Sequence, residues 1–274
     1  MNPSTGLFGL PDFFAPGVAT AFVLTALRVG GLLLVAPAWS AKSFPMKLRT
    51  AVLVVFATLL IPRASATADL TTLRITPVTF LSETIIGFVI GFAAAIIVAG
   101  AEFAGELMTN SIGLSGMAIL DPVNNTQGAI LGTFMQMLAV TLLLTGGGHL
   151  IMLQAVAQSF VSMPLGAPID LPSGMLAVTK AGTTIFSSGV QFAAPVIAAI
   201  LVANIALAIL GRAAPQLQVM SLAFPLQIGI GLLTFAGSIG LVVHALADWT
   251  PAYATTLDTF ARAVQVAPAP TMGR

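Results

Sequence analysis

Apolar runs long enough to cross a bilayer make up most of this 274-residue chain. The first, Val18–Pro37, has 20 residues, which as a helix extend about 30 Å, the thickness of a membrane's hydrocarbon core. A longer run, Val78–Ala101, carries Glu83 as its one charge. Only 7% of all residues are charged, whereas a soluble domain has roughly 25%. So few charges cannot cover a water-soluble surface, and the sequence therefore predicts an all-α membrane protein.

About six hydrophobic helical segments are expected, several of them short, kinked or broken by Pro and Gly. The apolar runs behind this estimate are Val18–Pro37, Ala51–Ile61, Val78–Ala101, Ala129–Thr145, Leu150–Leu165, Thr184–Leu210 and Leu217–Leu246. A Pro-rich loop is expected at Gly166–Gly174, and a polar tail at Asp248–Arg274.

The second segment is the least regular. Ala51–Ile61 has eleven residues, fewer than the roughly 17 that a span needs, and Pro62 is expected to end it. Lys42, Lys47 and Arg49 precede it and would mark the cytoplasmic side. If the segment crossed, Arg63 and Arg74 would lie on the opposite side, against that rule. We therefore expect a hairpin that enters and returns, with its backbone covered by partner subunits.

Catalytic and nucleic-acid-binding patterns are missing from the sequence. There is no Cys, the two histidines are 95 positions apart, and no His, Asp or Glu cluster has metal-ligand spacing. Gly146-Gly147-Gly148-His149 lacks the Lys of a phosphate loop, and no nucleophile elbow occurs. The net charge of +1, without a basic run, argues against a nucleic-acid partner. We expect no enzyme, no metal and no cofactor.

Four charged residues lie in or beside the apolar runs: Arg28, Glu83, Glu102 and Glu106. An ionisable group at bilayer depth costs on the order of 2.5–3.5 kcal/mol, so it usually faces a cavity or a partner. One interpretation is a substrate or proton pathway, or an ion pair between subunits. The other is a buried structural pair, such as Arg28 with Glu83, that holds two helices together.

The segment from Glu102 to Pro122 combines two carboxylates with a Gly-, Ser- and Asn-rich apolar patch, Met108–Met117, and closes with Asp121-Pro122. Its glycines remove side-chain bulk, and its methionines repack easily. This mixture fits a deformable plug that lines a conduit. It also fits a glycine-mediated contact between two helices, which is common in membranes.

A third feature is Leu210–Leu217. A helix is expected to end at Gly211, with Arg212 compensating the dipole at its C-terminus and Pro215, followed by Gln216, restarting the chain. This reads as a tight helical hairpin turn. A binding role is also possible, because Arg212 is one of few cations in the second half.

Several stretches, in the same order, resemble the FliR/SctT family of type III secretion proteins. The resemblance covers Ala26 to Leu246 and rests on Arg28–Pro37, Pro45–Arg49, Gly105-Glu106-Leu107 leading to Asp121-Pro122, Gly148-His149-Leu150, Ser159-Phe160, Pro164-Leu165-Gly166, Arg212–Leu217 and Phe224-Pro225-Leu226.

The resemblance implies a non-enzymatic subunit of the flagellar export gate in the bacterial inner membrane, at the basal body. One copy would join FliP and FliQ subunits around a channel for unfolded flagellar subunits, with FlhB and rod-base proteins as further partners. It also implies a FliP-like part (18–183) with a plug loop near 106–122, followed by a FliQ-like hairpin (184–247). Composition alone adds an N-terminal segment (1–17) and a C-terminal tail (248–274).

In that family a loop helps to close the channel. The positions here that correspond to it, together with Met108, are Asn110, Ser111, Ile112, Gly113, Leu114, Ser115, Gly116, Met117 and Ala118. We refer to Met108–Ala118 as the plug segment. Two alternatives to the flagellar gate are the equivalent SctT subunit of a virulence secretion system and a small-solute secondary transporter. The transporter would show paired half-repeats, and none is evident.

Overall fold

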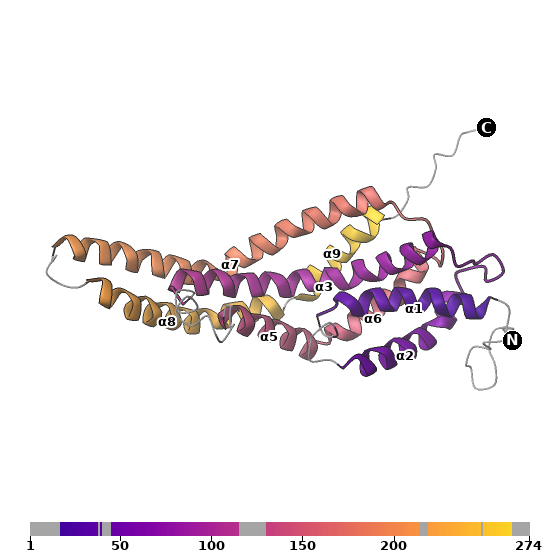
Figure 1. The fold of residues 1–274 in the computed structure, drawn as a ribbon, viewed down its shortest axis with the longest axis horizontal. Coiled ribbons are helices and arrows are strands. Elements are labelled where there is room, and N and C mark those ends of the chain that lie inside the picture. Colours follow the sequence, from indigo (N-terminus) through magenta and orange to yellow (C-terminus); the bar gives the residue numbers. More distant parts are fainter. Residues whose placement is uncertain are drawn as a thin grey trace. The chain divides into compact units, whose positions relative to one another are not determined.

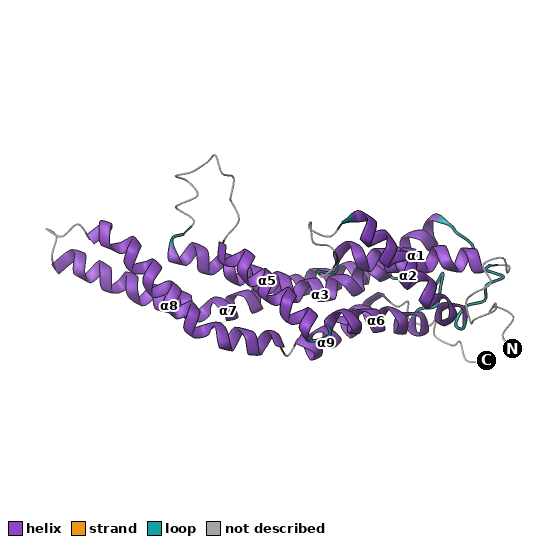
Figure 2. Cartoon of the chain, turned by 90° about the horizontal axis from the view of Figure 1, so that it is seen from below, coloured by secondary structure: helices purple, strands orange, loops and turns teal. Residues whose placement is uncertain are grey.

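The computed structural model describes residues 17–37, 39, 45–114, 130–213, 219–247 and 249–264, and its regular elements are helices (Figures 1 and 2). They are α1 (Val18–Val35), α2 (Met46–Ser65), α3 (Pro77–Ile112), α5 (Ile130–Thr145), α6 (Gly148–Ser162), α7 (Leu171–Ala213), α8 (Val219–Ala247) and α9 (Trp249–Val264). Five of these are long and apolar enough to cross a membrane, or six if α5 and α6 together form one span. The expected all-α fold with about six hydrophobic segments is confirmed.

The chain divides into two compact units, and α3 and α7 each contribute to both. The first unit comprises Met1–Ala95, Gly147–Lys180 and Pro251–Arg274, and the second comprises Ile96–Gly146 and Ala181–Thr250. In the first unit, α1 packs against α2, and α2 also contacts α6 (Figure 1). In the second unit, α5 packs against α8.

Glycines allow α1 and α3 to approach each other closely within the first unit. A Cβ atom added at Gly31 would lie 2.3 Å from the carbonyl oxygen of Thr84, and one added at Gly87 would meet the carbonyl of Arg28. Neither position can therefore hold a larger residue without separating the helices. Small residues that bring backbones together are the usual device for packing helices in membranes.

The expectation for the second apolar segment was wrong, because α2 is one continuous helix of 20 residues. It starts five residues before Ala51 and takes in Lys47 and Arg49, since charged side chains are tolerated at a helix end near the membrane surface. Pro62 lies inside its last turn, where losing one backbone hydrogen bond does not end the helix. At about 30 Å, α2 is long enough to cross a bilayer, so no returning hairpin is needed.

The helix α7 begins earlier than expected, within the segment interpreted as a loop. Asp170 precedes its first turn and accepts hydrogen bonds from the backbone N–H of Ser173 (3.2 Å) and from the Ser173 hydroxyl (2.7 Å). This is the geometry of an N-cap. Pro172 follows at the start of the helix, where its missing N–H costs nothing. The helix then continues through Pro195, as α8 continues through Pro225.

The start of the polar tail is in fact helix α9, a correction to the sequence interpretation. Tyr253 and Phe260 are seven residues apart, so they share one helix face, and both are buried. The Tyr253 hydroxyl donates a hydrogen bond to the carbonyl oxygen of Ile90 on α3 (3.3 Å). The Phe260 ring meets Phe92 edge to face, with centroids 6.1 Å apart. The helix therefore covers α3 inside the first unit.

Candidate functional site

The described part of the plug segment, Met108–Leu114, is the end of α3 and the turn that follows it. Gly113 has a positive φ of 85°. The backbone N–H of Gly113 donates to the carbonyl of Asn110 (3.2 Å), and that of Leu114 donates to the carbonyl of Thr109 (3.1 Å). These bonds form a Schellman cap, which ends a helix at a glycine. Ser115, Gly116, Met117 and Ala118 lie outside the described residues.

Two polar side chains of this turn are bonded within their own helix. The Thr109 hydroxyl donates to the carbonyl of Gly105, and the Ser111 hydroxyl to that of Leu107, both at 2.7 Å. Such bonds satisfy a hydroxyl without a partner helix. The helix end can therefore lie in apolar surroundings despite its polar composition.

The end of α3 packs against α8 within the second unit. Ile112 is fully buried, and a Cβ atom added at Gly231 would come within 2.4 Å of its Cγ1 atom. One added at Gly113 would lie 3.6 Å from Oε1 of Gln227 and 3.8 Å from the Phe224 ring. The point where the chain leaves α3 is thus held against the second helix of the predicted hairpin.

This geometry makes Gly113 a sensitive position. We expect Gly113→Ala to destabilise the turn by about 1–2 kcal/mol, because only glycine adopts positive φ without strain. If the plug segment closes a channel, the variant should also raise ion leakage through the assembled complex. Gly147→Ala is the matched control, since Gly147 has a similar φ of 76° and nothing within 4 Å of an added Cβ. Conductance measurements in planar bilayers compare the two, and equal leakage would contradict the assignment.

The two carboxylates before the plug segment lie one helical turn apart on α3. Glu102 is half-buried and accepts a hydrogen bond from Nε2 of Gln136 on α5 (2.8 Å), whereas Glu106 is exposed. The same helices approach closely where a Cβ atom added at Gly105 would lie 2.3 Å from the carbonyl oxygen of Leu131. These contacts connect α3 to α5.

The predicted hairpin, 184–247, falls on the later part of α7 and on α8, which run side by side there in Figure 1. Nε2 of Gln227 on α8 donates a hydrogen bond to Oδ1 of Asn204 on α7 (2.5 Å). A polar bond between apolar helices fixes their register, at roughly 0.6–2 kcal/mol. Arg212 lies exposed in the last turn of α7, as expected for a cation near a helix C-terminus. Pro215 and Gln216 lie outside the described residues.

Arg28 and Glu83 form a direct ion pair in the first unit. Nε of Arg28 lies 2.7 Å from Oε2 of Glu83, and both side chains have zero exposure. Nη1 of Arg28 also donates to the Ser159 hydroxyl and to the carbonyl oxygen of Met163, each at 3.0 Å. The second Glu83 oxygen accepts a hydrogen bond from the backbone N–H of Gly166 (2.8 Å).

These five residues form what we call the ion-pair cluster. The pair joins α1 to α3, as one of the two interpretations expected, but it also holds the link between α6 and α7 at Met163 and at Gly166. The guanidinium lies 4.3 Å from the centroid of the Phe160 ring, which adds a cation–π contact. Sequence reasoning missed the part played by Ser159, Met163 and Gly166. The one sequence feature that could have indicated these three residues is their position in or beside two stretches that carry the family resemblance, Ser159-Phe160 and Pro164-Leu165-Gly166.

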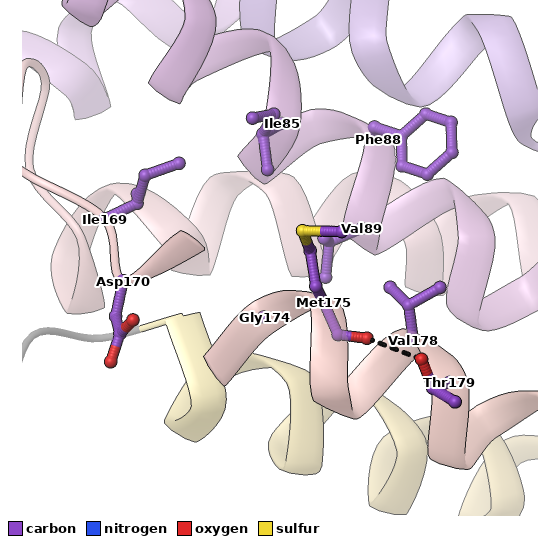
Figure 3. A pocket seen from close by; sticks show the side chains of 9 residues that line it. All are labelled: Ile85, Phe88, Val89, Ile169, Asp170, Gly174, Met175, Val178 and Thr179. Atoms are coloured by element: carbon purple, nitrogen blue, oxygen red, sulfur yellow. Dashed lines mark hydrogen bonds between the residues drawn. The ribbon is translucent and has the colours of Figure 1, made fainter. Parts of the chain in front are cut away.

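An apolar pocket of about 340 Å³ lies between α3 and the start of α7 in the first unit (Figure 3). Met175 points towards Val89 across it. Its one charged residue is Asp170, whose carboxylate already caps α7. In the part of the chain that the structure describes, no group of three or more His, Cys, Asp or Glu residues could hold a metal ion.

Comparisons with known proteins show which family this sequence matches. Residues 19–251 match the family described as bacterial export proteins, family 1. The flagellar biosynthetic protein FliR of Escherichia coli K12 is 33% identical over 219 residues, which cover 79% of this chain and 83% of that protein. The FliR protein of Caulobacter vibrioides is 28% identical over 249 residues, covering 88% and 98%. The chain therefore belongs to the FliR family of bacterial export proteins.

Proposed function

We propose that this chain is a core subunit of a protein-conducting export gate, in which one copy forms the channel together with FliP and FliQ subunits. As a FliR-family member it is a non-enzymatic membrane component of the flagellar type III export apparatus, in the inner membrane at the basal body. The proposal adds FlhB and rod-base proteins as further partners and unfolded flagellar subunits as cargo. Family membership leaves no support for a small-solute transporter.

The length of α7 carries the proposal of a multi-subunit channel. No charged residue occurs in the 31 positions from Ala181 to Gly211, between Lys180 and Arg212. As a helix this stretch extends about 46 Å, whereas the hydrocarbon core is about 30 Å thick. Fitting it into the core by tilting alone would need an angle of about 50°, outside the range of roughly 0–40° for membrane helices. Part of the stretch therefore needs protein around it.

The side chains of this stretch support the same conclusion. Phe186, Val202 and Ile209 are 62%, 67% and 64% exposed, and they span most of its length. Apolar groups beyond the reach of lipid are stable only when another apolar surface covers them. Neighbouring subunits of the gate would supply that surface. In this proposal the FliP-like part is 18–183 and the FliQ-like hairpin is 184–247.

The plug assignment belongs to the same proposal. The Schellman cap ends α3 at Gly113, and the neighbouring Ile112 packs against α8. A segment that closes a channel must start from a rigid base and still yield to a passing polypeptide. Small residues and Met give it that deformability.

Purification through a tag on this chain tests the subunit composition. After co-expression from the native operon, we expect a complex that contains two different small membrane proteins in unequal ratio, measured by native mass spectrometry. The chain expressed alone should be polydisperse in detergent, because its apolar surface lacks cover. A stable, monodisperse monomer would contradict the proposal.

A further inference from the structure

A second pocket in the first unit combines apolar walls with a cation. It has a volume of about 330 Å³ and lies between α1, α2 and α3. Along α1 it reaches from Ala26 to Leu34, which corresponds to about 12 Å of helix. Its walls are mainly aliphatic or aromatic, with Leu53 on α2 and Phe80 on α3, and Arg49 is the one charged residue that lines it. An elongated apolar groove with a cation fits an amphipathic ligand.

Arg49 has hydrogen-bonding capacity that the described residues do not use. Nη2 donates to the carbonyl oxygen of Trp39 (2.8 Å), but Nε is buried and has no hydrogen-bond partner among the described residues. A buried donor without an acceptor is destabilising, and such donors are rare in folded proteins. The guanidinium is always charged, and its planar fork matches the oxygens of a phosphate. This group therefore suits an anionic acceptor.

The start of α2 adds positive potential beside Arg49. The N-cap residue Pro45 makes no side-chain capping bond, and the first turn has no acidic residue. The positive end of the helix dipole is thus not offset by a side chain there. Lys47, in the same turn, is exposed and in contact with no acidic residue that the structure describes. Arg49 lines the pocket, and Lys47 and the N-terminus of α2 lie within three residues of it in the sequence.

The surroundings point to lipid as the source of the anion. Large apolar side chains of α2 are more than half exposed, among them Leu48, Val55 and Leu59. Trp39, bonded to Arg49, is of the residue type that gathers at the membrane interface. An apolar partner helix would offer Arg49 no acceptor, and free phosphate would leave the apolar groove empty. Basic pockets between membrane helices are typical headgroup sites.

We infer that this pocket binds an anionic phospholipid. Its phosphate accepts hydrogen bonds from Arg49 and is attracted by Lys47 and the start of α2, while an acyl chain fills the groove along α1. The inference gives a role to Pro45–Arg49, one of the stretches behind the family resemblance. It depends on neither the plug segment nor the channel.

The test uses the full chain in complex with its co-purified partner subunits. The complex is titrated with palmitoyl-oleoyl phosphatidylglycerol or with the zwitterionic phosphatidylcholine of the same chains, and native mass spectrometry counts the bound lipids. We expect Lys47→Gln/Arg49→Gln to weaken phosphatidylglycerol binding about tenfold or more, since each cation near a membrane surface contributes measurably to anionic lipid binding. The matched control, Arg63→Gln/Arg74→Gln, removes two charges elsewhere and should bind like the wild type.

A second variant tests the groove separately from the charges. Ala26→Phe fills the pocket but keeps Arg49 and Lys47, and it should also reduce phosphatidylglycerol binding. Unchanged binding in Ala26→Phe, equal losses in the two charge variants, or equal affinity for both lipids in the wild type would each overturn the inference. Recovery of intact complex by mass confirms folding of each variant before the titration.

Discussion

Replacing Glu83 by alanine should lower the free energy of unfolding by about 3–5 kcal/mol and sharply reduce the yield of assembled complex. Glu83 is the acidic partner of Arg28 in the ion-pair cluster, and neither side chain reaches the surface. Removing the carboxylate leaves a buried guanidinium with no counter-charge. It also leaves the backbone N–H of Gly166 without its acceptor. Both losses lower the free energy of unfolding.

A charge swap should fail to repair this damage. In Arg28→Glu/Glu83→Arg the two charges still attract each other, but the hydrogen bonds to the backbone are directional. A glutamate at position 28 cannot donate to the carbonyl of Met163, and an arginine at position 83 cannot accept from the N–H of Gly166. We therefore expect the swapped variant to remain close to the single variants in stability.

Thermal unfolding of the purified complexes measures these effects, with membrane-fraction yield as a second readout. Thr84→Ala serves as the control, because among the described residues the neighbouring Thr84 hydroxyl bonds within its own helix, to the carbonyl of Phe80. The apolar double variant Arg28→Met/Glu83→Leu should cost less than Glu83→Ala, since no unpaired charge remains. Full recovery in the charge-swapped variant would show that the backbone contacts contribute little.

Long apolar runs were predictable from the sequence, and so were the features that act along one helix. The first span and the start of α3 were located within two residues, because hydropathy alone determines them, whereas α3 continues eleven residues beyond the predicted end at Ala101. The position of Arg212 in the last turn of α7 follows from local capping rules. Each of these predictions needs no knowledge of which helices pack together.

The elements that were mispredicted either have a weak local hydropathy signal or depend on tertiary contacts. The start of α2 was missed because its charged first turn lowers the local hydropathy, although such residues are tolerated at the end of a span. The helix α9 was missed because its mean polarity hides one buried face with Tyr253 and Phe260. The bonds from Arg28 and Glu83 to the link after α6 join positions 83–135 residues apart, which sequence spacing cannot reveal.

Deleting Ser111–Met117 should convert the closed complex into one that conducts small ions. The deletion removes the last two residues of α3, the Schellman cap at Gly113 and most of the plug segment. If these residues close the channel, their loss leaves a water-filled path in place of an apolar seal. In planar bilayers the current should rise from baseline to a sustained level, with the complex still assembled.

The control deletion, Gln265–Thr271, removes the same number of residues, seven, from the C-terminal end. It should leave the conductance at baseline, because the proposal gives that end no part in closing the channel.

A second comparison distinguishes loss of the seal from loss of folding. Ile112 anchors the end of α3 on Gly231, so Gly231→Val should displace that end while keeping every plug residue. Leakage in both the plug deletion and Gly231→Val would support a seal positioned by α8. A plug deletion that assembles and stays closed would remove the plug assignment and leave the segment a helix-packing contact.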